Sequence, residues 1–384
     1  MTSRPLSVWI LGLALLAARL ASAQTFVANS VLRVAPDGEA RGLAEVRQGA
    51  SARVLRRQGF WLEVESGSAR GWVRISAVKL ATSSPATAMD TGRLGTHNIV
   101  ATSAARSMSA QDLIEGRSDH QAADRLPAFR PEPGQLMQFV TAGALNAQAT
   151  TELATASRSE EEAAGQHWVA RVMGVAPLHT SQDVQRYVNL VGGHLASRVD
   201  ASRTWRFGVL DTDAINAFAA PGGVVLVTSG LLRQLSSEDE FAAVLAHEIA
   251  HVVREHHYQV ILRSRQSETV VRGLRVDPGL SRASAQFYTR GLDAASEHEA
   301  DLLGVQLLAR AGYDPSAALS VLERLDALGT ADPRVALMAS THPPARERMD
   351  SLARAGIERL PVPAVSSPVR QARFARTVRA ALNP

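Results

Sequence analysis

LAHEIAHVVREHH, residues 245–257, holds four histidines and two glutamates in a segment that is otherwise apolar. The FAAVLA that leads into it and the Val-Val within it predict a helix that is nearly buried on all sides. Burying two histidines and a glutamate without partners costs several kcal/mol. A bound metal ion removes that cost, so the stretch predicts a buried metal site on a helix.

Helical geometry assigns different roles to these side chains. At about 100° per residue, His247 and His251 lie about 40° apart on one face, so their imidazoles converge on one ion. Glu248 lies about 100° from His247, beside the ion rather than directed at it. This is the H-E-x-x-H zinc pattern, with two histidine ligands and an adjacent glutamate as general base. Ser237 and Glu240 predict a capping box at the start of the helix.

The remaining polar residues of the stretch are expected to lie away from the ion. His257 stands where a metzincin has its third ligand, but the glycine that turns the chain back in that pattern is here Arg254. If the helix continues, His257 points roughly 280° and His256 roughly 180° away from His247. We therefore expect both at the surface or behind the ligands, and Glu255 at the solvated end.

A third ligand is predicted from the segment DAASEHEADLLGVQLLARAGYDP, residues 293–315, which reads as a second helix. Its residues at i, i+4, i+7 and i+11 share one face that turns apolar: Glu297, Asp301, Gly304 and Leu308. Two carboxylates on a buried face need a cation, so Glu297 is predicted as the third ligand and Asp301 as a group that orients a ligand. His298 and Glu299 lie on other faces and are the alternative ligands.

Composition and the N-terminus set limits on function and location. The 384 residues include no cysteine, which excludes disulfides and thiol catalysis, and the net charge of +4 is too small to predict a nucleic-acid partner. Arg4, a short apolar run and Ala21-Ser22-Ala23 predict a signal peptide over residues 1–23, cleaved after Ala23. We expect an exported, soluble, periplasmic protein, with an uncleaved membrane anchor as the alternative.

Four regions follow the signal peptide. Residues 24–82 alternate in short β-like runs and predict a small all-β barrel, while residues 83–145 are rich in Ala, Ser, Thr, Pro and Gly and predict a linker with a helix near SAQDLIEG. Residues 146–360 predict amphipathic helices and two strands joined by a turn at residues 221–223. Residues 361–384 form a basic amphipathic tail, which predicts contact either with an anionic membrane surface or with an acidic surface of the protein itself.

Four motifs in order resemble one family of zinc metallopeptidases, the family that includes the CAAX prenyl protease, the heat-shock protease HtpX and the mitochondrial overlapping-activity protease. They are NAFAAPGGVVLVTSGLL, LAHEIAHVVREH, EHEADLLG and THPPARER, and the resemblance covers roughly residues 150–350. It implies an α+β fold, a mostly helical zincin-like domain with a small β-sheet. It also implies one zinc ion held by His247, His251 and Glu297, with Glu248 as catalytic base. The soluble periplasmic branch of this family, which acts in outer-membrane protein quality control, is the most similar.

The same resemblance implies further site residues. His342 would lie near the metal, where it stabilises an oxyanion or occupies the open zinc position in a latent state. Arg348 would face the developing negative charge, and the alternative for both is a capping or core role. The edge strand along which an extended substrate aligns would contain Asn216, Ala217, Phe218 and Ala219.

The N-terminal region resembles bacterial SH3-like domains in its GFWLEVE and ARGWVRISAVKL runs. That resemblance implies a cell-wall or protein ligand, although Trp61 and Trp72 are expected to fill the small core. The sequence as a whole therefore predicts a zinc-dependent endopeptidase that cleaves unfolded or extended polypeptides in the cell envelope. The alternative is an envelope chaperone or scaffold whose SH3-like domain binds a partner and whose proteolysis is minor or latent.

Overall fold

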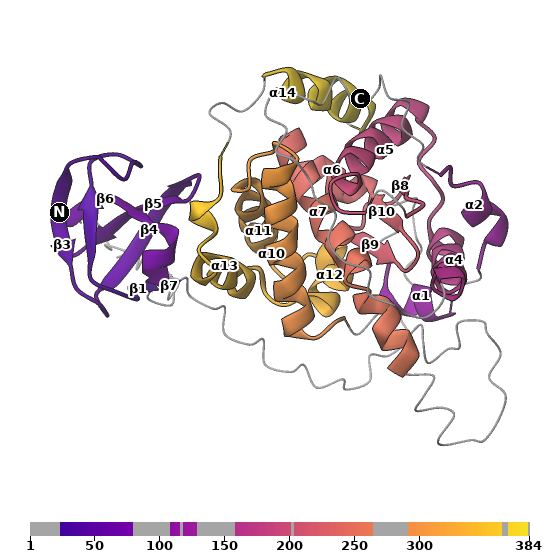
Figure 1. The fold of residues 1–384 in the computed structure, drawn as a ribbon, viewed down its shortest axis with the longest axis horizontal. Helices are drawn as coiled ribbons and strands as arrows, with labels where there is room; N and C mark the ends of the chain where they lie inside the picture. Colours follow the sequence, from indigo (N-terminus) through magenta and orange to yellow (C-terminus); the bar gives the residue numbers. More distant parts are fainter. Residues whose placement is uncertain are drawn as a thin grey trace, which may run out of the picture.

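The computed structural model describes residues 24–79, 108–115, 118–128, 158–200, 203–263, 291–362 and 368–382. Figure 1 shows an α+β molecule with an all-β N-terminal part beside a mostly helical body that contains a small sheet. The expected signal peptide and its cleavage site lie outside these residues. Within the described ranges, none of the helices combines the length and the apolar character needed to span a membrane.

The N-terminal part is an antiparallel sheet of seven strands in the order β3-β2-β6-β5-β4-β1-β7. The strands are β1 (Gln24–Phe26), β2 (Ser30–Arg33), β3 (Gly42–Val46), β4 (Ser51–Gln58), β5 (Trp61–Ser66), β6 (Ala69–Arg74) and β7 (Val78–Lys79), with the short helix η1 (Ile75–Ala77) before β7. Trp61 and Trp72 are buried, but the expectation that they fill the core was wrong, because they lie on the face of the sheet opposite Leu62 and Val73 and outside its apolar cluster. Each ring is covered by a guanidinium, with the Cζ of Arg74 at 4.4 Å from the Trp61 ring and that of Arg56 at 4.8 Å from the Trp72 ring.

The N-terminal sheet packs on the body through α11 (Ala317–Leu328) and α13 (Ala345–Arg354), which face it in Figure 1. Apolar side chains from both parts form one buried cluster, to which Phe26 and Leu62 contribute from the sheet and Leu322 from α11. Arg57 extends from β4 to α11, where its Nε donates to Glu323 at 2.5 Å and its Nη2 to the Ser320 hydroxyl at 2.6 Å. The two parts are therefore joined by a buried apolar contact and an ion pair.

The small sheet of the body has three strands in the order β8-β10-β9. They are β8 (Arg206–Leu210), β9 (Ala217–Ala220) and β10 (Val224–Thr228), followed by α6 (Ser229–Gln234). The hairpin between β9 and β10 turns at residues 221–223, as predicted. The expectation of two strands was wrong by one, because residues 211–216 interrupt the run and β8 pairs separately with β10, in parallel. This order leaves β9 at the edge of the sheet.

Helix α7 (Glu238–Val253) is the centre of the body, with side chains such as Phe241, Leu245 and Ile249 fully buried. The helices that pack on it include α5 (Gln182–Ala196), α10 (Ala294–Arg310) and α11. The body also contains α4 (Arg158–Val175), α12 (Ala336–Thr341) and the short turns η2 (Pro333–Val335) and η3 (Ile357–Arg359). Gly304 of α10 lies so close to α7 that a Cβ there would be 3.2 Å from the backbone nitrogen of His247. This close crossing brings the polar start of α10 to the histidines of α7 (Figure 1).

The ends of α7 differ in part from expectation. Ser237 caps the helix by accepting from the Glu240 backbone N–H at 3.1 Å, but the Glu240 carboxylate accepts from the backbone of Ser236 at 2.7 Å instead of closing a reciprocal box. The helix does not continue through the histidine pair. It ends at Val253, Glu255 adopts a left-handed φ of 55°, and the chain is helical again over residues 256–263.

The region expected to be a linker contributes two short helices, α1 (Ala110–Glu115) and α2 (His120–Asp124). The first confirms the helix predicted near SAQDLIEG. Leu113 and Leu126 are buried in one apolar cluster with Trp168 of α4. The described parts of this region therefore pack on the body.

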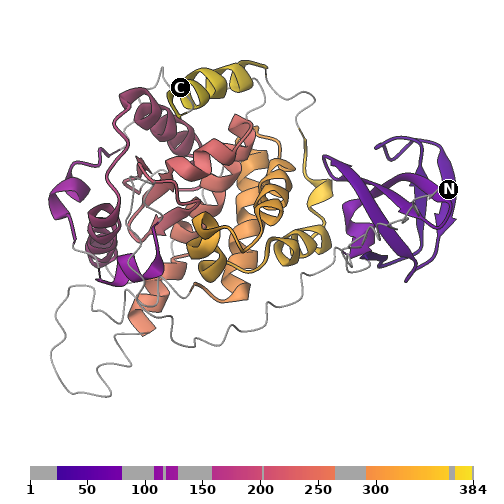
Figure 2. The same cartoon turned by 180° about the vertical axis from the view of Figure 1, so that it is seen from behind.

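The C-terminal tail consists of α14 (Pro368–Phe374), the π-turn segment η4 (Ala375–Arg379) and α15 (Ala380–Leu382), and it lies across α5 and α7 (Figure 2). Its apolar face, made by Phe374, Val378 and Leu382, is buried in the main core. The Nε of Arg373 donates to Glu238 at 2.7 Å. The sequence predicted contact of the tail with either a membrane or the protein itself. In this structure the tail packs on an acidic surface of its own protein.

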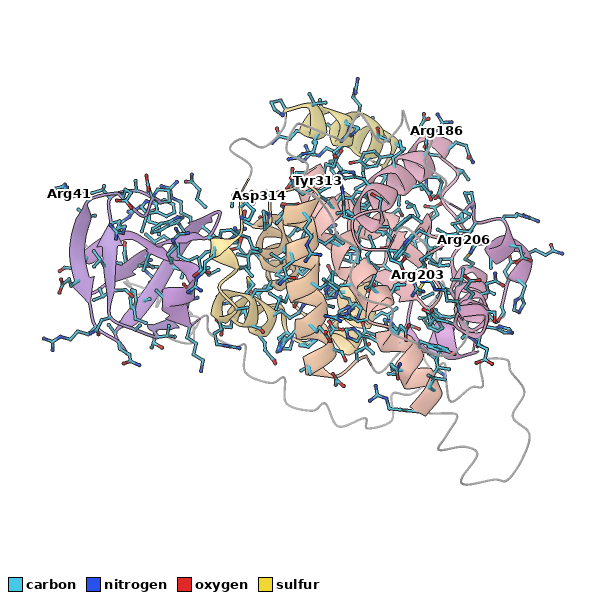
Figure 3. All side chains as sticks on the ribbon, viewed as in Figure 1. Arg41, Arg186, Arg203, Arg206, Tyr313 and Asp314 are labelled. Atoms are coloured by element: carbon cyan, nitrogen blue, oxygen red, sulfur yellow. The ribbon has the colours of Figure 1, made fainter. Side chains whose placement is uncertain are left out.

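The contact beneath the tail is a buried polar network at the start of α7. Tyr187 and Tyr313 donate to the two oxygens of Glu238 at 3.0 and 3.3 Å, and the backbone of Asp314 donates to Asp239 at 3.0 Å. Figure 3 shows Tyr313 and Asp314 on the side of the body where the tail packs. The tail therefore fastens the end of the helix that carries the histidines.

Candidate metal centre

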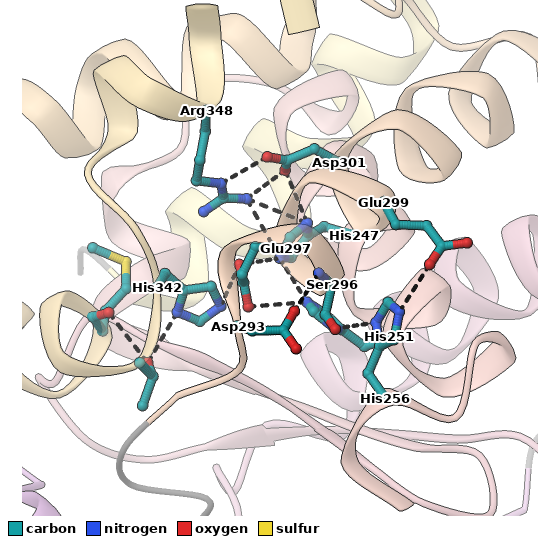
Figure 4. A network of polar contacts seen from close by, with 12 residues as sticks. His247, His251, His256, Asp293, Ser296, Glu297, Glu299, Asp301, His342 and Arg348 are labelled. Atoms are coloured by element: carbon teal, nitrogen blue, oxygen red, sulfur yellow. Dashed lines mark hydrogen bonds and ion pairs between the residues drawn. The ribbon is translucent and has the colours of Figure 1, made fainter. Parts of the chain in front are cut away.

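Four side chains from separate parts of the body converge at one point (Figure 4). His247 and His251 come from α7, Glu297 from the first turn of α10, and His342 from the residue after α12; one ligand atom from each lies within 4.8 Å of all the others. The Nε2 atoms of the two α7 histidines are 3.0 Å apart. Glu297 lies 3.7 Å from His247 Nε2 and 3.5 Å from His251 Nε2. The three residues predicted as ligands are thus brought together.

The donors fit a zinc ion in number, type and spacing. Two nitrogens bound to the same tetrahedral zinc lie about 3.3 Å apart, close to the separations seen here. Glu297 Oε2 is buried and has no hydrogen-bond partner among the described residues. Burial lowers the pKa of both His247 and His251, which keeps the imidazoles neutral as ligation requires, and burial without a cation raises the pKa of Glu297 to about 8. An ion at this point would satisfy Glu297 Oε2 and hold the carboxyl ionised.

Asp301 and Arg348 hold His247 from behind. The Asp301 Oδ1 lies 3.0 Å from His247 Nδ1, and Arg348 donates to the same carboxylate at 2.9 Å from Nε and 2.6 Å from Nη2. Although burial acts to raise it, the Arg348 guanidinium holds the pKa of Asp301 well below its usual range. An ionised Asp301 accepts the Nδ1 proton of His247 and so directs the lone pair of Nε2 toward the centre. This is the geometry of the orienting role predicted for Asp301.

His256 supports His251 in a similar way. The two Nδ1 atoms are 3.0 Å apart, and His256 Nε2 lies 3.3 Å from Glu299 on the first turns of α10. The angular argument that turned His256 away from the ligands was wrong, because the helix breaks at Glu255 instead of continuing. The conclusion that His256 is a group behind the ligands is nevertheless what the geometry shows. The sequence signal was weak, since no glycine or proline marks the break.

The other histidine of the pair and the alternative ligands stay outside the cluster. The ring centroid of His257 lies 5.4 Å from that of His251, and burial lowers its pKa to about 3, so it is not the surface group that a continued helix would make it. Glu299 is half-exposed and pairs with Arg254 at 2.9 Å. His298 lies 3.8 Å from the exposed Glu347. None of the three is among the four donors that converge.

Glu248 lies beside the cluster, buried with only 4% of its surface exposed. Burial raises its pKa to about 8, while the positive charge of Arg348 acts in the opposite direction. A divalent cation at the cluster also acts to lower that pKa, which brings the carboxylate into the range where it accepts a proton near neutral pH.

The predicted edge strand runs past Glu248. Asn216 immediately precedes β9, which has β10 on one side and no strand on the other within the described sheet. The backbone N–H and C=O of Asn216 are both bonded to Thr228, at 3.1 and 2.9 Å. Its side-chain Oδ1 is buried without a hydrogen-bond partner in the described part of the chain. The main chain of Asn216 is therefore occupied by Thr228, and the open edge of the sheet begins with β9 itself.

A known protein family matches the part of the chain that contains this site. Residues 180–355 match the model of Peptidase family M48. The matched segment contains all four converging donors together with Glu248, Asp301 and Arg348. The M48 match agrees with the metallopeptidase class that the motifs predict, and the donor set is suited to one zinc ion.

Three similar proteins belong to two named kinds of protease. The chain is 31% identical over 234 residues to the beta-barrel assembly-enhancing protease of Yersinia pestis, covering 57% of this chain and 48% of that protein. It is 31% identical over 216 residues to the protein of the same name in Escherichia coli strain K12, covering 52% and 44%. It is 36% identical over 150 residues to the mitochondrial metalloendopeptidase OMA1 of Schizosaccharomyces pombe, covering 38% and 44%. The chain thus spans about half the length of the curated relatives it matches.

Proposed function

We propose that this protein is a zinc-dependent endopeptidase that cleaves extended polypeptides. The observation that carries the proposal is the convergence of His247, His251 and Glu297 beside a buried Glu248 at the edge of a β-sheet. Zinc held by these three residues supplies a Lewis acid that polarises the scissile carbonyl and lowers the pKa of water. The remaining chemistry belongs to side chains of this chain.

Glu248 is the general base in this proposal. Its carboxylate takes a proton from the attacking water and then delivers it to the leaving amine. Its burial limits the contact of this carboxylate with bulk solvent, which supports its exchange of a proton with the reacting atoms. The M48 match over the same residues supports the assignment.

His342 and Arg348 have different roles in this proposal. His342 Nε2 lies 3.9 Å from Glu297 Oε2, among the donor atoms, so the arrangement described here favours the latent alternative in which His342 completes the ligand set. When it moves away, its imidazole is placed to stabilise an oxyanion, the other role that the family resemblance implies. The two bonds from Arg348 to Asp301 favour a positioning role for this arginine over direct contact with the substrate.

The N-terminal sheet and the cellular role are proposed with it. The described residues 24–79 of the region predicted as 24–82 form an SH3-like module, a proposal supported by the antiparallel strand pairing and by the Gly71–Val73 run on β6. The names of the relatives and the predicted export signal support a periplasmic enzyme that removes misfolded envelope proteins, of the HtpX and CAAX prenyl protease type. In the same proposal, the module binds a cell-wall or protein ligand.

Glu248→Gln tests the mechanism. The amide cannot accept the proton, so cleavage of unfolded casein should fall by at least about a hundredfold, the contribution typical of general acid–base catalysis. Zinc content, measured by atomic absorption, should remain at one ion per chain because the three ligands are untouched. Glu160→Gln, in the exposed first turn of α4, is the matched control and should leave both quantities unchanged. Casein cleavage by Glu248→Gln at the wild-type rate would refute the assignment.

A further inference from the structure

Two hollows meet at the candidate centre and lie on opposite sides of it. Both are lined by Asn216, Ala217, Glu248 and His342, so both open at the edge strand and at the proposed base. The first extends between α7, α11 and α12. The second extends past β9 toward α4 and the residues that lead into α10. A peptide held along β9 with its scissile bond at Glu248 would direct a neighbouring side chain into each.

The first hollow is mostly apolar, although the paired side chains of Asp301 and Arg348 also line it. Its walls are made by Ala243 and Val244 of α7, Val321 and Leu325 of α11, and Met338 of α12. Protein interiors are packed to crystal density and hold few voids larger than a water molecule. An apolar space that opens beside a metal cluster is instead the usual form of a pocket for an apolar group of a ligand. The second hollow differs, because Glu297, His257 and Thr341 place polar atoms along its wall.

The position of Ala243 connects this pocket to the reaction centre. Ala243 lies one helical turn before His247 on α7, so the two side chains share a face, and a group that touches Ala243 lies next to the centre. Asn216 lines both hollows, so the start of the edge strand lies where the two hollows join. Together these features locate both the main chain and one side chain of a bound peptide.

We propose that the pocket between α7, α11 and α12 selects a large apolar side chain, such as leucine, phenylalanine or methionine, at one of the two substrate positions that flank the scissile bond. The proposal rests on the endopeptidase function proposed above and adds the substrate class to it. It identifies Ala243, Val244, Val321, Leu325 and Met338 as the residues that determine specificity. Unfolded proteins offer more substrates of this kind, because most such side chains are buried in folded proteins.

The experiment identifies which peptide bonds are cleaved and does not rely on the total rate of cleavage. The full-length protein is loaded with zinc and incubated with denatured casein and with a mixture of synthetic peptides, and the new termini are identified by mass spectrometry. Leucine should be preferred over alanine at one flanking position by at least about tenfold, since a single methylene in an apolar pocket is worth that much. Met338→Trp, which fills the pocket from its half-exposed rim, should remove this preference and favour glycine, alanine and serine instead.

Leu292→Trp is the matched control, because Leu292 is equally half-exposed but lines the second hollow. It should leave the leucine preference at the first position intact. Val244→Ala enlarges the pocket and should extend the preference toward tryptophan, which keeps the test open if the Met338→Trp protein does not fold. Equal effects of the two tryptophan variants, or a wild-type profile without apolar preference, would overturn the pocket assignment while the endopeptidase function stands. Absence of any cleavage by the zinc-loaded wild type would overturn both.

Discussion

Replacing Asp301 with asparagine removes one negative charge and one acceptor from behind the predicted ligand His247. In the wild type, Oδ1 of Asp301 accepts from both His247 Nδ1 and Arg348 Nη2, and Oδ2 accepts from Arg348 Nε. An amide has a single oxygen. If that oxygen faces His247, the amide N–H meets the guanidinium, donor against donor. If it faces Arg348, the amide donates to His247 Nδ1 and the imidazole proton moves to Nε2, where it blocks the ligand atom.

Both arrangements weaken zinc binding, so the loss should lie at the upper end of the range for such supporting groups, about a hundredfold or ~2.7 kcal/mol. Arg348 also loses its counter-charge while 7% exposed, and breaking a buried ion pair costs about 3 kcal/mol or more of the free energy of unfolding. Zinc affinity is measured by competition with a chromophoric chelator, and stability of the metal-free protein by urea unfolding.

Asp213→Asn is the control for this change, because Asp213 also pairs with an arginine, Arg233 at 2.6 Å, but at a partly exposed site that contains none of the four converging donors. It should leave zinc affinity unchanged and lower stability only slightly. If Asp301→Asn binds zinc within twofold of the wild type, the argument that Asp301 sets the tautomer of His247 is wrong.

Two further predictions concern the framework around the site. Arg373→Ala should lower the free energy of unfolding by about 3 kcal/mol, because it removes the guanidinium that pairs with the fully buried carboxylate of Glu238. Replacing the exposed Arg376 with alanine should cost little, and equal urea midpoints for the two variants would contradict the prediction. Burial lowers the pKa of His194, whose Nε2 contacts the Ala311 carbonyl at 3.0 Å. As the pH falls below about 6.5, His194 is therefore protonated in the unfolded state before it is protonated in the folded state. The contribution of the neutral, buried His194 to the free energy of unfolding is present above that pH and is lost below it. Against wild type, His194→Gln should show a slope of unfolding free energy with pH that is shallower by up to about 1.4 kcal/mol per unit, and identical slopes would refute the assignment.

Much of the candidate site could be predicted because it is local to two helices. The spacing of His247, Glu248 and His251, and that of Glu297 and Asp301, follow from the 3.6-residue repeat alone. The burial of both helices follows from their apolar flanks. What the repeat could not predict is where a helix stops. The break at Glu255 has no proline or glycine to announce it, so the role of His256 behind His251 was reached by an incorrect angular argument.

The sequence by itself therefore determined which residues could bind a metal, because a helix places residues i and i+4 on one face whatever surrounds it. Only the tertiary structure decided which of them meet. The close crossing at Gly304 sets Glu297 beside the α7 histidines, and the packing of α13 brings Arg348 to Asp301 across 47 residues of sequence. The apolar pocket likewise exists only between helices that are distant in the chain. Contacts of this kind depend on how whole faces pack, and no local period encodes that.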